Sequence, residues 1–244
     1  MTKRLLDRQV SVVEYMTSGA GIFGDGCDPF PALHGIDRRL LRLEAHFSYA
    51  KRMEKITAVF PRTFGLLGSG KSEMLRAFID ICPPTTISRL DNARQFHRFL
   101  ASCWMRTAPD PPYICDVAAC ELACADVDAD VQDCGSPPGA NARYAGRRGV
   151  RRSPAVVLLR CAYDIRPIFE AGSGHPAPIR RETPLAIVVP PGADGPQVFE
   201  VIAPLFDLFA ELDDWTDPRE LNTAPEFVDF LADLSAQGLI EVRR

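Results

Sequence analysis

Residues 65–72, GLLGSGKS, have the residue types and spacing of a phosphate-binding loop. In such a loop, backbone N–H groups at a helix N-terminus hold the phosphates, the lysine reaches the far phosphate, and the serine binds magnesium. This chemistry requires a buried strand that runs directly into the first glycine. The preceding residues are FPRTF, and Pro61 argues against a central strand. We therefore expect a turn between two helices, with Gly65 or Gly68 at a helix end, and nucleotide binding is the alternative.

The eight cysteines are a second set of residues that could do chemistry. Cys115, Cys120 and Cys124 have the spacing C-x4-C-x3-C, and the last two share one helix face. A zinc site needs four ligands, and the plant-type iron–sulfur spacing differs from this one by one residue. Free cysteine is commonly a small buried hydrophobe, so we expect core packing, with a metal or redox site as the alternative.

Charged and nucleophilic residues show no catalytic pattern. Four aspartates at positions 126, 128, 130 and 133 form an acidic helix end that we expect to be solvated, since the glycine and glutamate of a calcium loop are missing. Arginines cluster between positions 143 and 152, where a solvated linker is the expected structure and contact with an acidic partner or nucleic acid is the alternative. Neither a nucleophile elbow nor a spaced pair of carboxylates is present. We expect no catalytic residue and no metal ligand in this chain.

Composition limits the class of protein. The chain has 244 residues, 46% of them hydrophobic, which is enough for one large domain or two small ones. A net charge of −4 gives no support to nucleic-acid binding. No apolar run is long enough to span a membrane, and the N-terminus lacks the pattern of a signal peptide. A cytoplasmic location with reduced cysteines is therefore expected.

Hydrophobic periodicity predicts an α+β fold with two domains. Residues 1–134 are expected to form a helical domain, residues 135–153 a linker, and residues 154–244 a smaller α+β domain. Gly and Pro in residues 17–35 indicate a loop. Helices are expected over residues 3–16, 36–60, 72–82, 89–105, 113–131, 204–212 and 226–236. Strands are expected over residues 155–159, 184–189 and 197–202, with a last short strand after Gly238.

The order of several weak motifs carries a family resemblance. In AVFPRTFGLLGSGKSEMLRAFIDICPP, an FP pair, an LLG triplet, a short helix and a PP pair follow one another, and a helix ending in FL comes next. The next segment, PPYICDVAACELA, places Tyr113, Asp116, Ala118 and Glu121 at recurring positions. Most of residues 45–240 thereby resembles the MbnC-like family, the partner subunits of methanobactin biosynthesis, which accompany TIM-barrel iron proteins.

The resemblance implies a non-catalytic subunit. An MbnB-like TIM-barrel iron enzyme would be its partner and would hold the iron, and an MbnA-like precursor peptide would be the substrate, whose cysteines become oxazolone and thioamide groups. The helical domain would dock the enzyme, with Tyr113, Asp116 and Glu121 as docking residues. The C-terminal domain would resemble a leader-recognition, winged-helix-like module. Neither nucleic acid nor membrane is an expected partner.

Leader binding has a physical basis in the predicted hairpin. An edge strand offers unpaired N–H and C=O groups, to which an extended peptide can add as another strand. An ordinary hairpin buried against the following helices is the alternative that the residues alone favour. Which strand is the free edge is open. The candidate peptide-binding residues are Leu185, Ile187, Val189, Val198, Glu200 and Ile202.

A winged-helix DNA-binding regulator is a further alternative, because a hairpin with helices can also build that fold. Such a regulator needs a basic recognition helix. The helix expected at residues 226–236, EFVDFLADLSA, contains Asp and Glu but no Arg or Lys. This composition argues against DNA binding. The subunit hypothesis instead predicts exposed apolar surface on the isolated chain.

Overall fold

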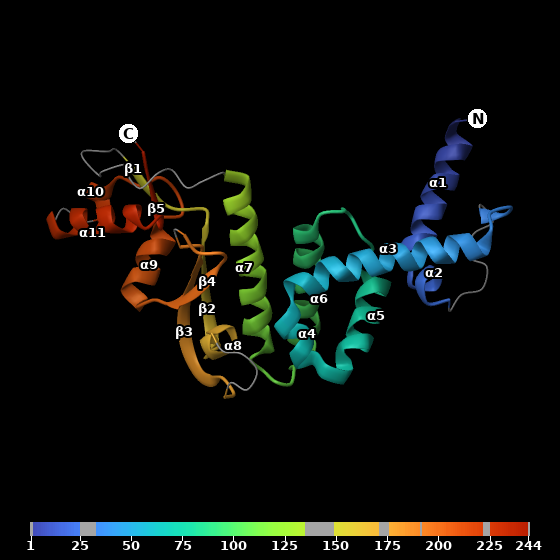
Figure 1. Ribbon diagram of the computed structural model, residues 1–244, viewed down its shortest axis with the longest axis horizontal. Coiled ribbons are helices and arrows are strands. Elements are labelled where there is room, and N and C mark those ends of the chain that lie inside the picture. The colour runs from blue at the N-terminus through green and yellow to red at the C-terminus, as the bar shows by residue number, and fades with distance from the viewer. Residues whose placement is uncertain are drawn as a thin grey trace. The chain divides into compact units, whose positions relative to one another are not determined.

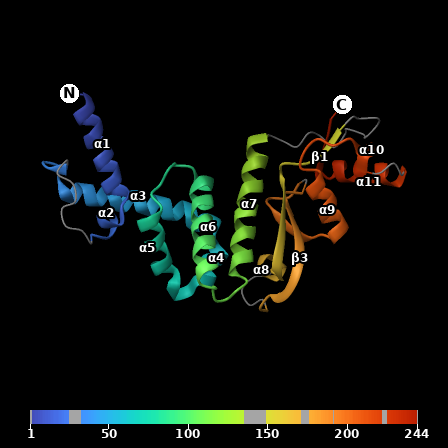
Figure 2. The ribbon, with the colours of Figure 1, turned by 180° about the vertical axis from the view of Figure 1, so that it is seen from behind.

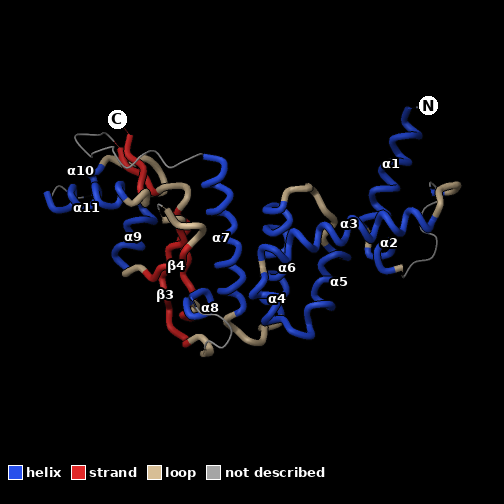
Figure 3. The backbone as a smooth tube through the Cα atoms, viewed as in Figure 1, coloured by secondary structure: helices blue, strands red, loops and turns tan. Residues whose placement is uncertain are grey.

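The computed structural model describes residues 2–24, 33–134, 149–170, 176–190, 192–221 and 225–243. They form an α+β fold, as the periodicity predicts, and Figure 1 shows the elements in chain order. The chain divides into two compact units, an N-terminal unit of Met1–Pro111 and a C-terminal unit of Pro112–Arg244. Figure 3 shows that the strands all belong to the C-terminal unit.

The N-terminal unit is helical. It contains α1 (Thr2–Thr17), α2 (Gly19–Phe23), α3 (Arg38–Val59), α4 (Pro61–Leu67), α5 (Lys71–Ile81) and α6 (Arg89–Arg106). Side chains of Asp37 and Ser88 accept hydrogen bonds from backbone N–H groups in the first turns of α3 and α6, which fixes where these helices begin. Helix α2 lies inside the predicted 17–35 loop, because Ser18 caps a short turn there. Residues 25–32 of that loop lie outside the described part.

Aromatic rings fill the core of the N-terminal unit. The Phe96 ring centre lies 5.6 Å from that of Phe60, 5.4 Å from that of Phe64 and 5.1 Å from that of Phe78. Phe60, Phe78 and Phe96 are fully buried. These contacts join α4, α5 and α6 to Phe60, which directly follows α3, so packing holds the end of α3 in place.

A buried arginine ties α3 to α6. Arg52 Nε donates to Asn92 Oδ1 at 3.0 Å, and its Nη2 donates to Gln95 Oε1 at 2.7 Å. Its guanidinium lies 4.5 Å from the centre of the Phe78 ring. Burial lowers the pKa of Arg52 to about 10, so the group keeps its charge at neutral pH.

The C-terminal unit is built on a three-stranded antiparallel sheet in the order β2-β3-β4. Its strands are β2 (Val156–Asp164), β3 (Ile179–Val188) and β4 (Gln197–Glu200), and a separate antiparallel pair joins β1 (Gly149–Arg152) to β5 (Ile240–Arg243). The helices are α7 (Ile114–Cys134), α8 (Arg166–Glu170), α9 (Ala203–Glu211), α10 (Pro218–Leu221) and α11 (Pro225–Ala236).

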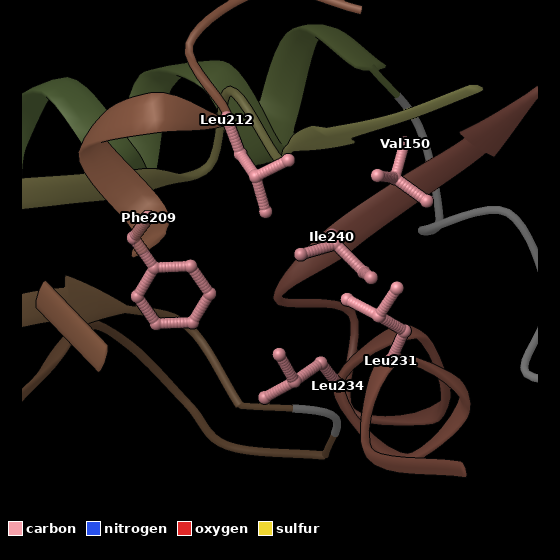
Figure 4. Packing of buried hydrophobic residues seen from close by; sticks show 6 residues of the cluster. All are labelled: Val150, Phe209, Leu212, Leu231, Leu234 and Ile240. Carbon is pink, nitrogen blue, oxygen red and sulfur yellow. The ribbon is translucent and has the colours of Figure 1, made fainter. Parts of the chain in front are cut away.

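One hydrophobic cluster joins the β1–β5 pair to the helices that follow the sheet. Figure 4 shows side chains from β1, α9, α11, β5 and the turn after α9 converging on this cluster. Gly238 has φ +73° just after α11, as expected for a glycine that ends a helix and lets the chain return as a strand. The members of the cluster are Val150, Phe209, Leu212, Leu231, Leu234 and Ile240.

The unit boundary differs from the predicted domain boundary at residue 134. Helix α7 was assigned to the helical domain, but the structure divides the chain after Pro111 and packs α7 on β2 and β3 of the C-terminal unit (Figure 2). Strand β1 also begins inside the predicted 135–153 linker, because Val150 is fully buried in the hydrophobic cluster. Residues 135–148 lie outside the described part. Helical periodicity identifies α7 as a helix but does not say which core it joins.

Candidate functional site

Strand β4 is an outer strand of the three-stranded sheet. Strand β3 lies between β2 and β4, so both of its sides are occupied, while β4 has β3 as its one strand neighbour among the described residues. Val201 N–H donates to Pro184 O at 3.0 Å, so the main-chain groups of Val201 point toward β3. Those of every second residue before it, including Phe199, point the same way. In an antiparallel pair, the N–H and C=O groups of successive residues point to opposite sides. The main-chain groups of Val198 and Glu200 therefore point away from β3.

Pro184 explains where this pairing stops. It lies within β3, and its carbonyl accepts from Val201, but proline has no N–H to return the bond. The pairing of β3 with β4 therefore ends at this position, and β4 ends at Glu200.

Exposed apolar side chains stand beside this edge. Phe199 is 42% exposed on β4, and Ile202 is 71% exposed just after it. Phe199 pairs with Ala186, and its side chain is on the opposite sheet face from those of Val198 and Glu200. Exposed phenylalanine and isoleucine next to main-chain groups that point away from β3 are suited to an added strand with apolar side chains.

The predicted peptide-binding residues divide into two sets. Leu185 and Ile187 on β3 are fully buried, so their side chains belong to the core. Val189 lies half-buried just beyond β3. Val198 is half-buried, while Glu200 and Ile202 are exposed, and these last three lie at the outer strand. The sequence prediction omitted Phe199, although alternation along QVFEV places it on the other face of the same strand.

Four charged groups lock the end of β4 in place. Arg166 Nη2 lies 2.7 Å from Asp164 Oδ2 and 2.6 Å from Glu200 Oε2. Arg181 binds the same two carboxylates, at 2.7 Å from Asp164 Oδ2 and 2.8 Å from Glu200 Oε1. The Arg166 hydrogen bond, reinforced by Arg181, holds the pKa of Asp164 well below its usual range. Glu200 is thus neutralised locally and tied to β2, β3 and the start of α8.

The predicted docking residues Asp116 and Glu121 lie on α7, and Tyr113 directly precedes this helix, near the irregular part of the sheet. The register of β2 against β3 shifts between Cys161 and Tyr163, where the backbone bulges. Tyr163 N–H donates to Asp116 Oδ2 at 2.9 Å, and the Tyr113 ring meets the Tyr163 ring edge-on at 6.1 Å. Burial raises the pKa of Asp116, and hydrogen bonds from the backbone of Tyr163 and Ala162 oppose that rise. Asp116 therefore stabilises the bulge.

The third predicted docking residue, Glu121, is 4% exposed. All three docking residues are therefore partly or wholly engaged inside the C-terminal unit. Their contact with a partner stays a prediction. Little of the surface of these side chains is exposed to a partner.

Burial raises the pKa of the Cys115 and Cys161 thiols, which favours their protonated form. Cys120 and Cys161 are buried, in line with the expected core packing, while Cys115 and Cys124 are half-buried. Burial raises the pKa of Cys161 to about 12. A hydrogen bond with Cys124, together with burial, also raises the pKa of Cys120. In the part of the chain that the structure describes, no three His, Cys, Asp or Glu residues are placed to hold a metal ion.

The 65–72 segment contains a turn between two helices, as expected, formed by Gly68–Gly70. Helix α3 ends at Val59, α4 follows at once, and a short 3₁₀ turn over Gly68–Gly70 leads into α5. Gly68 ends α4 with φ +51°, and Lys71 Nζ lies 4.9 Å from the centre of the Phe64 ring. The strand that a phosphate-binding loop requires is replaced by a helix, so this geometry does not support nucleotide binding.

Comparison with known proteins adds no family to this geometry. No protein-family model matches the chain, and no curated protein matches it significantly. Among the described helices, none has the length and apolar character needed to cross a membrane. The function must therefore be argued from the edge of the sheet and its surroundings.

Proposed function

We propose that this chain is the non-catalytic, peptide-binding subunit of an iron-dependent peptide-modifying complex. The leader of an MbnA-like precursor adds to β4 as a further strand, and an MbnB-like TIM-barrel partner holds the iron and performs the oxidation of the precursor cysteines. The observation that carries the proposal is the pair of outward-facing main-chain residues on β4, Val198 and Glu200, beside exposed Phe199 and Ile202. The sequence resemblance to MbnC-like subunits supports the same role.

The size of the edge determines what kind of peptide it can hold. Val198 and Glu200 offer up to four main-chain hydrogen bonds, each with a net value of about 0.5–1.5 kcal/mol. The resulting roughly 2–6 kcal/mol is below the ~8 kcal/mol of micromolar binding, before any cost of ordering the peptide is subtracted. Apolar side chains of the leader must therefore contact Phe199 and Ile202, so leader recognition requires an extended segment with large apolar residues.

The state of the cysteines fits a supporting role. Buried thiols with raised pKa values stay protonated at neutral pH, so they would not compete with the precursor cysteines for an oxidising partner. The electrostatic lock on Glu200 keeps β4 aligned and cancels a charge that would otherwise face an incoming acidic residue.

Proline substitution on β4 tests the proposal directly. The Val198 N–H points away from β3, so Val198→Pro removes an outward donor while leaving the β3–β4 hydrogen bonds intact. We expect about fivefold weaker binding of a fluorescently labelled precursor leader, measured by anisotropy. Val198→Ala keeps the N–H and is the matched control, with binding expected within about twofold of wild type.

If Val198→Pro binds the leader as tightly as wild type does, and both variants unfold like wild type, strand addition at β4 is excluded. Loss of binding in both variants would mean that the Val198 side chain, rather than its main chain, makes the contact.

A further inference from the structure

The outer edge of β4 is closed at both ends. Pro196 lies two residues before Val198, at the next position that faces away from β3 in the same alternation, and proline has no N–H to offer there. At the other end, the carbonyl of Ile202 accepts two N–H groups from the first turn of α9, each at 3.0 Å. Val198 and Glu200 are therefore the residues of this edge that offer both an N–H and a C=O to an added strand.

So short an edge does not by itself choose a segment of the leader. The main chain of any extended peptide repeats its N–H and C=O groups every two residues, so a leader shifted by two residues makes the same hydrogen bonds to Val198 and Glu200. In strand addition, main-chain hydrogen bonds give affinity and side-chain contacts give selectivity. The side chains of β4 must therefore decide which leader segment binds.

Among these side chains, Phe199 is placed for the closest contact. Its main chain points toward β3, so a leader residue opposite it in an antiparallel addition forms a pair without hydrogen bonds, with Cα atoms about 4.5 Å apart rather than about 5.5 Å. Its partner on β3 is Ala186, which has a single methyl group and is 4% exposed, whereas Phe199 is 42% exposed. Apolar surface of Phe199 is therefore available to the facing leader side chain.

The side chains of Val198 and Glu200 offer less selectivity. They lie on the other face of the sheet, and Val198 is half-buried. The two carboxylate oxygens of Glu200 are bound by Arg166 at 2.6 Å and by Arg181 at 2.8 Å. Asp164 binds the same two arginines, so two negative charges face two positive ones. This end of β4 therefore favours neither sign of charge in the leader.

We infer that Phe199 sets the register of a leader that adds antiparallel to β4, and that the leader residue opposite Phe199 is aromatic or β-branched. Aromatic pairs, and pairs of an aromatic with a β-branched residue, are among the favourable cross-strand pairs of antiparallel sheets. The inference rests on the proposed peptide binding at β4 and adds the chemistry of the residue that is recognised.

Synthetic peptides test this inference on the full chain. Each is about nine residues long, within the usual length of a strand, and has a host sequence of alternating threonine and serine. The central residue is phenylalanine, isoleucine, alanine or glutamate. Titration into isotope-labelled protein, followed by NMR through the backbone amide signals of β4, gives the affinity of each peptide. We expect the phenylalanine and isoleucine peptides to bind about three- to fivefold more tightly than the alanine peptide.

Substitution of Phe199 separates its role from that of the edge. Phe199→Ala should reduce the preference for the phenylalanine peptide over the alanine peptide to within about twofold. Phe199→Lys should turn the preference toward the glutamate peptide, because opposite charges then face each other across the strands. Gln197→Ala is the matched control, since Gln197 is exposed on the same sheet face of β4, and it should leave the preference unchanged. Urea unfolding of these variants should stay close to wild type because both positions are exposed.

The outcomes distinguish this inference from the proposed function. Amide shifts on β4 that are equal for all four peptides, or a preference that persists in Phe199→Ala, would overturn the role of Phe199 while strand addition stands. If no peptide shifts the amide signals of Val198 and Glu200, strand addition at β4 fails and the inference fails with it. A preference for glutamate gained by Phe199→Lys would support the register.

Discussion

Replacement of Asp116 by alanine should destabilise the C-terminal unit without affecting the N-terminal unit. The carboxylate on α7 accepts a hydrogen bond from Tyr163 N–H at 2.9 Å, at the bulge where β2 loses its register with β3. An unsatisfied backbone donor costs about 1–3 kcal/mol, and the half-buried position lets water replace part of the bond. We therefore expect a loss of about 2 kcal/mol in the free energy of unfolding.

The two tryptophans allow the units to be followed separately. Trp104 lies on α6 of the N-terminal unit, and Trp215 lies in the C-terminal unit, where the Arg151 guanidinium is 4.8 Å from its ring centre. In a Trp104→Phe background, urea unfolding reports the C-terminal unit through Trp215. With a slope of about 2 kcal/mol per molar urea, the midpoint for Asp116→Ala should fall by about 1 M. In a Trp215→Phe background, the midpoint should not move.

Asparagine at position 116 separates the acceptor from the charge. The amide oxygen can still accept from Tyr163 N–H, so Asp116→Asn should lose well under half as much as Asp116→Ala. Burial raises the pKa of Asp116 in the folded state. The stability that Asp116 contributes is therefore fully present below the pKa of the unfolded chain, and it is lost as pH rises through the pKa of the folded state. The stability of wild type relative to the asparagine variant should therefore decline as pH rises from about 4.

Two results would refute this reasoning. If Asp116→Ala unfolds at the wild-type urea midpoint, the bulge does not depend on the α7 carboxylate. If asparagine and alanine are equally destabilising at pH values where Asp116 is ionised, the negative charge rather than the hydrogen-bond acceptor holds the bulge.

Three further substitutions test other parts of the structure. A Cβ at Gly21 would lie 2.0 Å from the backbone oxygen of Tyr15, so Gly21→Ala should destabilise the N-terminal unit by about 1–3 kcal/mol in the Trp215→Phe urea assay. Gly65 has open space around it within α4, so Gly65→Ala should stabilise the N-terminal unit by about 0.5–1 kcal/mol. Equal effects of the Gly21 and Gly65 substitutions would contradict the packing at these two positions. The pKa of Asp164 is lowered in the folded state, so this residue stabilises the fold above the pKa of the unfolded chain. That stability is lost as pH falls through the pKa of the folded state. Asp164→Asn should therefore make the free energy of unfolding depend less on pH below about pH 4. An unchanged pH profile would mean that the ion pairs of Asp164 with Arg166 and Arg181 do not stabilise the fold. Mg-ATP should not change the melting temperature of wild type or of Lys71→Ala. A shift with Mg-ATP in wild type that Lys71→Ala abolishes would restore the phosphate-binding alternative.

The sequence determined the local elements of this protein. Periodic apolar residues placed the long helices at residues 36–60 and 89–105 within a few positions of α3 and α6, because a helix that buries one face repeats every 3.6 residues. Pro61 and the glycines after it predicted a turn between helices at the GKS motif, because proline and glycine act on the backbone itself. The α+β class followed from the same local patterns.

The tertiary structure alone decided how these elements combine. Helix α7 is apolar enough to join either core, and its packing on β2 and β3 depends on contacts that sequence periodicity does not encode. The order of strands in the sheet places β4 at an edge. It thereby decides that Leu185 and Ile187 are buried while Phe199 is exposed. Strand order and helix partners are set by long-range contacts, whereas the sequence pattern reports only that a side chain is buried and not what buries it.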